Sequence, residues 1–181
     1  MKRMLVMLLL AMSFALLSTQ VALADTHVIT HDDILAGTDV TITQGDSATF
    51  QFYWYAGTPG LVREFTRCSA VTLQITHDGV DEFFADAPET NAYWSPIERA
   101  TPEFIAEKFI WANDHAKTPV SLAYWRMPLP TETLAVGDYD LYWALAWDHP
   151  TIDLGDWDGD GRMDHYPRGG LDGGIELHIV P

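Results

Sequence analysis

Beyond its first 24 residues the sequence is poor in lysine and has no long apolar run. Only Lys108 and Lys117 lie in that part of 181 − 24 = 157 residues. It holds all 26 acidic residues and 8 of the 10 lysine and arginine residues, so its net charge is 8 − 26 = −18. Such a surface repels phosphate groups, which argues against nucleic acids and anionic membranes as partners and favours cations. A salty habitat would explain the same acidity.

Cysteine is equally scarce, because Cys68 is the only one. We predict that it is a small buried apolar residue beside the strand that follows it, since a single thiol forms no internal disulfide. A nucleophilic role would need a histidine partner, which the sequence does not place. The chain also lacks the serine-hydrolase, zinc-protease, phosphate-loop and dinucleotide motifs, so a binding or structural protein is expected rather than an enzyme. A pair of acids for glycoside hydrolysis stays open.

Residues 1–24 are predicted to be a signal peptide. Lys2 and Arg3 form a basic start, residues 4–17 are apolar, and residues 22–24 read Ala-Leu-Ala, a cleavage site. The apolar run is shorter than the roughly 18 residues of a membrane span. We therefore expect a periplasmic or extracellular protein, of bacterial type, with a single domain over 25–181 and no membrane anchor after cleavage.

Alternation of apolar and polar residues with a period of two dominates the rest of the chain and predicts strands. Six or so strands with turns between them favour an all-β fold, an antiparallel β-sandwich. In each expected strand one set of alternate residues faces inward: 48, 50, 52 and 54; 71, 73 and 75; 120, 122 and 124; 139, 141, 143, 145 and 147; and 175, 177 and 179.

Two local features refine this fold. Residues 134–141 resemble the corner before the penultimate strand of immunoglobulin-like domains, which implies that the Tyr139 hydroxyl bonds back to the upstream backbone. Thr101 and Pro102 are typical of a helix start and predict a short helix over about 102–113, packed on one sheet. The same segment is less coherent as a strand.

A calcium site is predicted in a long loop before the last strand. Asp156, Asp158, Asp160 and Asp164 stand at positions one, three, five and nine, with Gly161 at six for the sharp turn. Alternate residues of a curled loop point inward, and Ca²⁺ takes six to eight oxygens. Arg162 at position seven would offer its backbone carbonyl.

This loop resembles the D-x-D-G-D-G-x-x-D calcium loops of FG-GAP and VCBS repeats, and also EF-hand and dockerin loops. The resemblance implies an ion site, with the four aspartates as side-chain ligands, and no fold. It departs from an EF-hand because Pro167 stands where a bidentate glutamate belongs. Water or Asp153, Asp172 or Glu176 would have to supply the missing ligands.

A second, speculative metal site lies at the mature amino terminus. Cleavage after Ala24 would leave Asp25 first and His27 third. The free amine, two backbone amides and the imidazole would then form a square-planar nitrogen set suited to Cu²⁺ or Ni²⁺.

Aromatic residues on outward strand faces leave the ligand class open. Tyr53, Tyr55, Trp125 and Tyr142 would form a sugar-stacking platform, unless the expected helix and loops cover them. The sequence thus predicts an exported calcium-binding β-sandwich with a binding or structural role and an unknown protein or carbohydrate partner. The alternatives are a small polysaccharide-acting enzyme and a free-standing carbohydrate-binding module, each with structural calcium.

Overall fold

The computed structural model describes residues 25–108, 120–152 and 165–181 of the chain. The predicted signal peptide lies outside these residues. The strands are β1 (Thr26–Thr30), β2 (Val40–Thr43), β3 (Ser47–Ala56), β4 (Ser69–His77), β5 (Val80–Ala85), β6 (Glu98–Arg99), β7 (Ser121–Leu129), β8 (Gly137–Trp147), β9 (Thr151–Ile152), β10 (His165–Tyr166) and β11 (Gly169–Val180). The helices are α2 (His31–Ala36), α3 (Pro59–Cys68) and α4 (Pro102–Lys108), with the 3₁₀ turns η1 (Glu89–Tyr93) and η3 (Thr131–Thr133). No described helix is long and apolar enough to cross a membrane.

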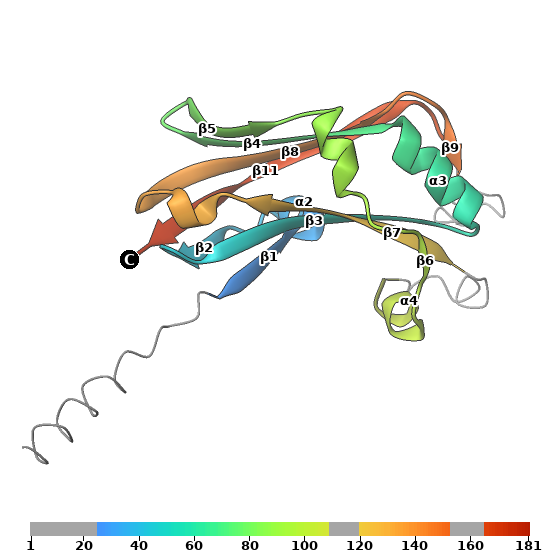
Figure 1. Cartoon of the computed structure of the whole chain (residues 1–181), viewed down its shortest axis with the longest axis horizontal. Coiled ribbons are helices and arrows are strands. Elements are labelled where there is room, and N and C mark those ends of the chain that lie inside the picture. The colour runs from blue at the N-terminus through green and yellow to red at the C-terminus, as the bar shows by residue number, and fades with distance from the viewer. Residues whose placement is uncertain (1–24, 109–119, 153–164) are drawn as a thin grey trace, which may run out of the picture.

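Two sheets pack face to face, which confirms the predicted β-sandwich (Figure 1). One sheet has the order β2-β11-β8-β4-β5 and the other β1-β3-β7-β6. Most neighbours run antiparallel, but β1 pairs with β3 and β2 with β11 in parallel. Because these two edge strands run parallel to their neighbours, both sheets are mixed.

The core lies between the sheets and follows the predicted alternation. Every second residue is buried in β4, in β8 from Tyr139 onward and in β11 from Ile175 onward, as expected from strands that bury one face. Trp143 of β8 is fully buried, and its ring contacts Phe50 and Phe52 of β3, with centroids 6.0 and 5.5 Å apart. These aromatic contacts join the two layers.

The predicted tyrosine corner is present. The Tyr139 hydroxyl donates a hydrogen bond of 3.0 Å to the backbone carbonyl of Ala135, four residues upstream. Tyr139 itself is buried in the main core. The corner thereby fixes the chain at the entrance to β8, the central strand of its sheet.

The prediction for β7 placed the wrong face inward. Trp125, Met127 and Leu129 are buried, whereas Tyr124 is only half-buried and Arg126 is exposed. Both faces of this strand carry large apolar residues, so alternation alone does not distinguish them. The structure buries the Trp125 indole, which donates a 2.7 Å hydrogen bond to the Thr90 carbonyl of η1.

Helix α3 is an element that we did not predict from the sequence, although it starts with the same Thr-Pro pair as α4. Thr58 caps it through a 3.4 Å hydrogen bond from the Leu61 amide, and Pro59 stands in its first turn. Its buried residues, Val62 and Phe65, face the sandwich, and the Phe65 ring stacks on Trp54 with centroids 3.7 Å apart. The helix closes one end of the molecule (Figure 1).

The helix predicted over 102–113 is present in its first part as α4. Its Phe104 amide donates a 3.2 Å hydrogen bond to the Thr101 hydroxyl, as the capping prediction required. The Phe104 ring lies edge-on against Tyr53 of β3, with centroids 5.3 Å apart, so α4 covers the outer side of the four-stranded sheet. Residues 109–113 lie outside the described residues.

Candidate ligand-binding face

The outer face of the five-stranded sheet has Tyr142 near its centre. Tyr142 of β8 stands opposite Gln74 of β4 and Gly174 of β11, and Gln74 stands opposite Phe84 of β5. Directly opposed residues of antiparallel strands point to the same face, so the four share one row across the sheet. Tyr142 and Phe84 are 37% and 56% exposed. They lie two strands apart, about 10 Å.

Two hollows adjoin Tyr142 on this face. The first, of about 470 Å³, lies over small residues such as Ala70, Ala144 and Gly170 and reaches Asp86 and Asp172. The second, of about 360 Å³, is lined by Asp39, Asp140, Gly174 and Glu176, among others. Both include Tyr142. Small residues beside an aromatic ring thus leave room for a ligand, and carboxylates border that room.

The polar groups of the first hollow are held in place by hydrogen bonds. The Thr72 hydroxyl donates to Asp86 at 2.9 Å, and the Ala87 amide donates to the same carboxylate oxygen at 2.8 Å. Partial burial, followed by the charge and the hydrogen bond of Asp172, raises the pKa of Tyr142. The face thus offers an apolar ring with hydrogen-bond acceptors beside it.

The other aromatic residues expected in a sugar platform do not join Tyr142. Trp125 is fully buried. Tyr53 and Tyr55 lie on the opposite sheet, half-buried, where Phe104 of α4 contacts both rings. The predicted covering by the helix is therefore correct for these two tyrosines, and only Tyr142 of the set is exposed.

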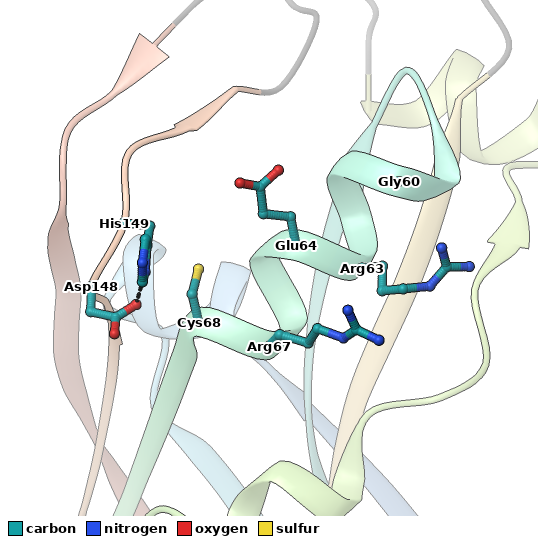
Figure 2. Close-up of a pocket in the computed structure, with 7 residues that line it drawn as sticks. All are labelled: Gly60, Arg63, Glu64, Arg67, Cys68, Asp148 and His149. Carbon is teal, nitrogen blue, oxygen red and sulfur yellow. Dashed lines mark hydrogen bonds and ion pairs between the residues drawn. The ribbon is translucent and has the colours of Figure 1, made fainter.

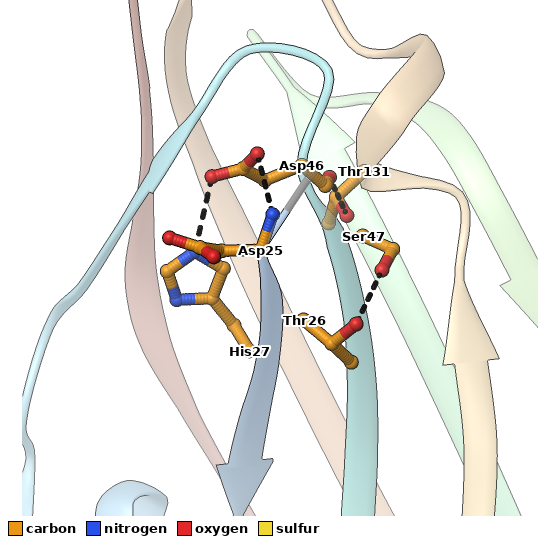
Figure 3. Close-up of polar contacts among 6 residues, drawn as sticks. All are labelled: Asp25, Thr26, His27, Asp46, Ser47 and Thr131. Carbon is orange, nitrogen blue, oxygen red and sulfur yellow. Dashed lines mark hydrogen bonds and ion pairs between the residues drawn. The ribbon is translucent and has the colours of Figure 1, made fainter. Parts of the chain in front are cut away.

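The two residues of the predicted copper site meet at one carboxylate. The Asp25 backbone nitrogen donates to Asp46 Oδ1 at 3.1 Å, and His27 Nε2 lies 3.4 Å from Asp46 Oδ2 (Figure 3). Parallel pairing of β1 with β3 produces this arrangement, because it sets Thr26 beside Ser47. A copper chelate would have to exchange both contacts for metal bonds, and the site stays a prediction.

The predicted calcium ligands Asp156, Asp158, Asp160, Arg162 and Asp164 lie outside the described residues, as does the auxiliary ligand Asp153. The other two candidates are placed on β11: Asp172 borders the first hollow beside Tyr142, and Glu176 lies in a different cluster.

That cluster joins His178 to three carboxylates. His178 Nδ1 lies 2.7 Å from Asp138 Oδ1, Nε2 lies 3.8 Å from Glu176, and an Asp39 oxygen lies within 4.8 Å of the His178 and Glu176 donor atoms. The hydrogen bond to Asp138 is the main cause that raises the pKa of His178, with the charges of Asp138, Glu176 and Asp39 adding to it. These neighbours therefore stabilise the protonated form of the imidazole.

Cys68 has the histidine neighbour that the sequence did not place. It is half-buried at the end of α3, and His149 and Asp148 lie beside it. The residues are 81 positions apart, so no local pattern indicates the contact. Cys68 packs against the main core directly before β4, as expected, but it is half-buried rather than buried.

No family model and no curated protein matches this chain. Among solved structures, it is similar to the crystal structure of the cysteine protease inhibitor EhICP2 from Entamoeba histolytica, with 14% identity over 85% of this chain and 94% of the other, at a TM-score of 0.32. It is also similar to the solution structure of amebosin, with 11% identity over 86% and 99% of the two chains, at a TM-score of 0.30. Likenesses at these values carry no argument about function.

Proposed function

We propose that this is an exported, calcium-binding β-sandwich protein that binds neutral carbohydrate on the outer face of its five-stranded sheet. The observation that carries the proposal is the position of Tyr142, exposed between two hollows that carboxylates border. Aromatic rings offer sugars an apolar surface, and carboxylates accept hydrogen bonds from hydroxyl groups.

The charge of the chain narrows the ligand class. Acidic residues of the face include Asp86, Asp140, Asp172 and Glu176, and the net charge after residue 24 is −18. Sulfated or uronic polysaccharides would be repelled. A neutral glycan avoids this repulsion and still uses every carboxylate as an acceptor. The predicted calcium ion would stabilise the domain away from the ligand chemistry.

Affinity electrophoresis and calorimetry against neutral polysaccharides, with millimolar calcium present, test the proposal. Tyr142→Ala should weaken binding at least tenfold, equivalent to about 1.4 kcal/mol. Phe84→Ala should weaken it less, since that ring is at the edge strand of the sheet. Tyr93→Ala is the matched control, because Tyr93 is equally exposed but belongs to η1. Undiminished binding by Tyr142→Ala would contradict the proposal.

Export is tested separately by N-terminal sequencing of the released protein, which should start at Asp25. The enzymatic alternative rests on Asp86 and Asp172, which line the same hollow as two carboxylates. It predicts new reducing ends when the protein is incubated with a polysaccharide that it binds, whereas a binding module releases none.

A further inference from the structure

The end of α3 and the end of β8 bring three metal-ligating residue types together. Ser69, the first residue of β4, pairs with Trp147, the last residue of β8. Cys68 and Asp148 are therefore neighbours, and the Asp148 amide donates a 3.2 Å hydrogen bond to the Cys68 carbonyl. His149 follows directly. The backbone ladder of the sheet thus sets the positions of all three residues.

Their donor atoms converge. One oxygen of Asp148, one ring nitrogen of His149 and Sγ of Cys68 all lie within 4.8 Å of one another. His149 and Asp148 are also hydrogen-bonded to each other (Figure 2). Zn²⁺ with bonds of about 2.0–2.3 Å holds tetrahedral ligands about 3.3–3.8 Å apart. Cys68 Sγ therefore has to approach the other two donors by at most about 1 Å, and the hydrogen bond between Asp148 and His149 has to open. The Asp148 and His149 side chains are 72% and 65% exposed, which leaves them free to rotate.

A fourth donor lines the same cavity of about 500 Å³. Glu64 stands four residues before Cys68 on α3, and residues at this spacing share one helix face. Figure 2 shows the Glu64 carboxylate and Cys68 Sγ on the same side of the helix, whereas the side chains of Arg63 and Arg67, which also line the cavity, extend in another direction. The cavity is thus lined by one thiol, one imidazole, two carboxylates and two guanidinium groups. Glu64 does not belong to the group of donor atoms within 4.8 Å of one another, so its exposed side chain has to rotate toward them to bind the same ion.

The environment of the thiol fits a ligand better than a nucleophile. Burial is the main cause that raises the pKa of Cys68, and the charges of Asp148 and Glu64 raise it further, against hydrogen bonds that lower it. A raised pKa lowers the thiolate fraction and with it the reactivity of the thiol as a nucleophile. A divalent cation reverses this effect, because the same two carboxylates stabilise the cation that displaces the proton.

We propose that Cys68, Asp148 and His149 bind a zinc-type divalent transition-metal ion, with Glu64 as the fourth ligand. Thiolate and imidazole select such ions over Ca²⁺ and Mg²⁺, which prefer oxygen ligands alone. Binding replaces the S–H bond by a metal–sulfur bond and releases one proton to solvent. The site is separate from the carbohydrate face and does not depend on the proposed function.

Cobalt gives a direct assay of this site. Co²⁺ bound to a thiolate shows a charge-transfer band in the near ultraviolet, and Cys68 is the only cysteine of the chain. With millimolar calcium present, the wild-type protein should show this band at one Co²⁺ per chain, with the intense visible bands of tetrahedral geometry. Zn²⁺ should abolish both, and acidification should weaken binding, since protons compete for sulfur and imidazole.

Variants distinguish residues that bind the metal from residues that only lie near it. His149→Gln and Asp148→Asn should each raise the dissociation constant for Co²⁺ at least tenfold, and Cys68→Ser should abolish the band. His77→Gln is the matched control, because His77 also lies beside an adjacent aspartate, Asp78, at 3.7 Å. If the wild-type protein shows no thiolate band, or if His149→Gln and Asp148→Asn bind as wild type, the site is refuted.

The role of Glu64 as the fourth ligand is tested separately. Glu64→Gln should weaken binding about tenfold and change the visible bands, whereas Glu132→Gln, an exposed glutamate of η3, should do neither. Unchanged Co²⁺ affinity and visible bands in Glu64→Gln would refute Glu64 as the fourth ligand.

A measurement that needs no cysteine variant is alkylation of Cys68 by iodoacetamide. Zn²⁺ should slow it at least tenfold in the wild-type protein, and equal rates with and without Zn²⁺ would refute the metal site.

Discussion

The tyrosine corner allows a quantitative test of the fold. Tyr139→Phe removes one hydroxyl and leaves the ring in place, where it is 5% exposed and packs near His77 with ring centroids 4.8 Å apart. The change therefore isolates the 3.0 Å hydrogen bond to the Ala135 carbonyl. An intramolecular hydrogen bond contributes about 0.5–1.5 kcal/mol net.

The position of the acceptor sets where in that range the loss should fall. Ala135 is exposed, so its carbonyl can bind water after the substitution and does not become a buried unsatisfied group. We expect a loss of about 1 kcal/mol in the free energy of unfolding. For a domain of this length that corresponds to a fall in Tm of about 2–4 °C. Tyr139→Ala would also remove the buried ring and should cost about 3–5 kcal/mol.

Urea denaturation and thermal unfolding of the mature protein measure this loss. Tyr142→Phe is the matched control, since it removes the same hydroxyl from the same strand at an exposed position. The free energy of unfolding of Tyr142→Phe should stay within about 0.5 kcal/mol of the wild-type value. Equal losses in the two variants, or no loss in Tyr139→Phe, would show that the corner does not stabilise β8.

Three further predictions concern ions and protons. Calcium at ten times a dissociation constant of roughly 0.1–1 mM should stabilise the domain by about 1.4 kcal/mol and so raise its Tm. Asp158→Ala or Asp160→Ala should remove this Tm increase. Equal unfolding midpoints in calcium and in chelator would contradict the site. Mature protein that starts at Asp25 should bind one Cu²⁺ and show a visible absorption band, and retention of that band in His27→Ala would contradict the site. The raised pKa of His178 should stabilise the fold below the unfolded value of about 6.5, and this contribution should disappear as the pH rises through the folded value. The Tm difference between wild type and His178→Gln should accordingly shrink with rising pH; a constant difference would contradict the link.

Local patterns in the sequence determined most of the sandwich. The alternation in β4, β8 and β11 identified their buried faces correctly, because a strand with one face in the core must carry apolar residues at every second position. The tyrosine corner and the cap of α4 were also predicted correctly, because each is formed by residues within four positions of one another.

Patterns failed where tertiary packing outweighed them. Helix α3 was not predicted, although Thr58 and Pro59 form the same helix start as Thr101 and Pro102; its Val62 and Phe65 are buried against the sandwich. Strand β7 has apolar residues on both faces, so only the fit of Trp125 between η1 and the core decides its orientation. Packing of this kind depends on side chains from segments distant in sequence.

The candidate sites show the same division. Sequence alone singled out the calcium loop and the pair Asp25 and His27, because their ligands are close along the chain. It named Tyr142 but joined it to aromatic residues of the other sheet, and it left Cys68 without a partner. Only the register of β4 on β8 brings Cys68 to His149, and only strand order sets Tyr142 in a row with Phe84. Strand order and register depend on the combined packing of both sheets, which no short segment encodes.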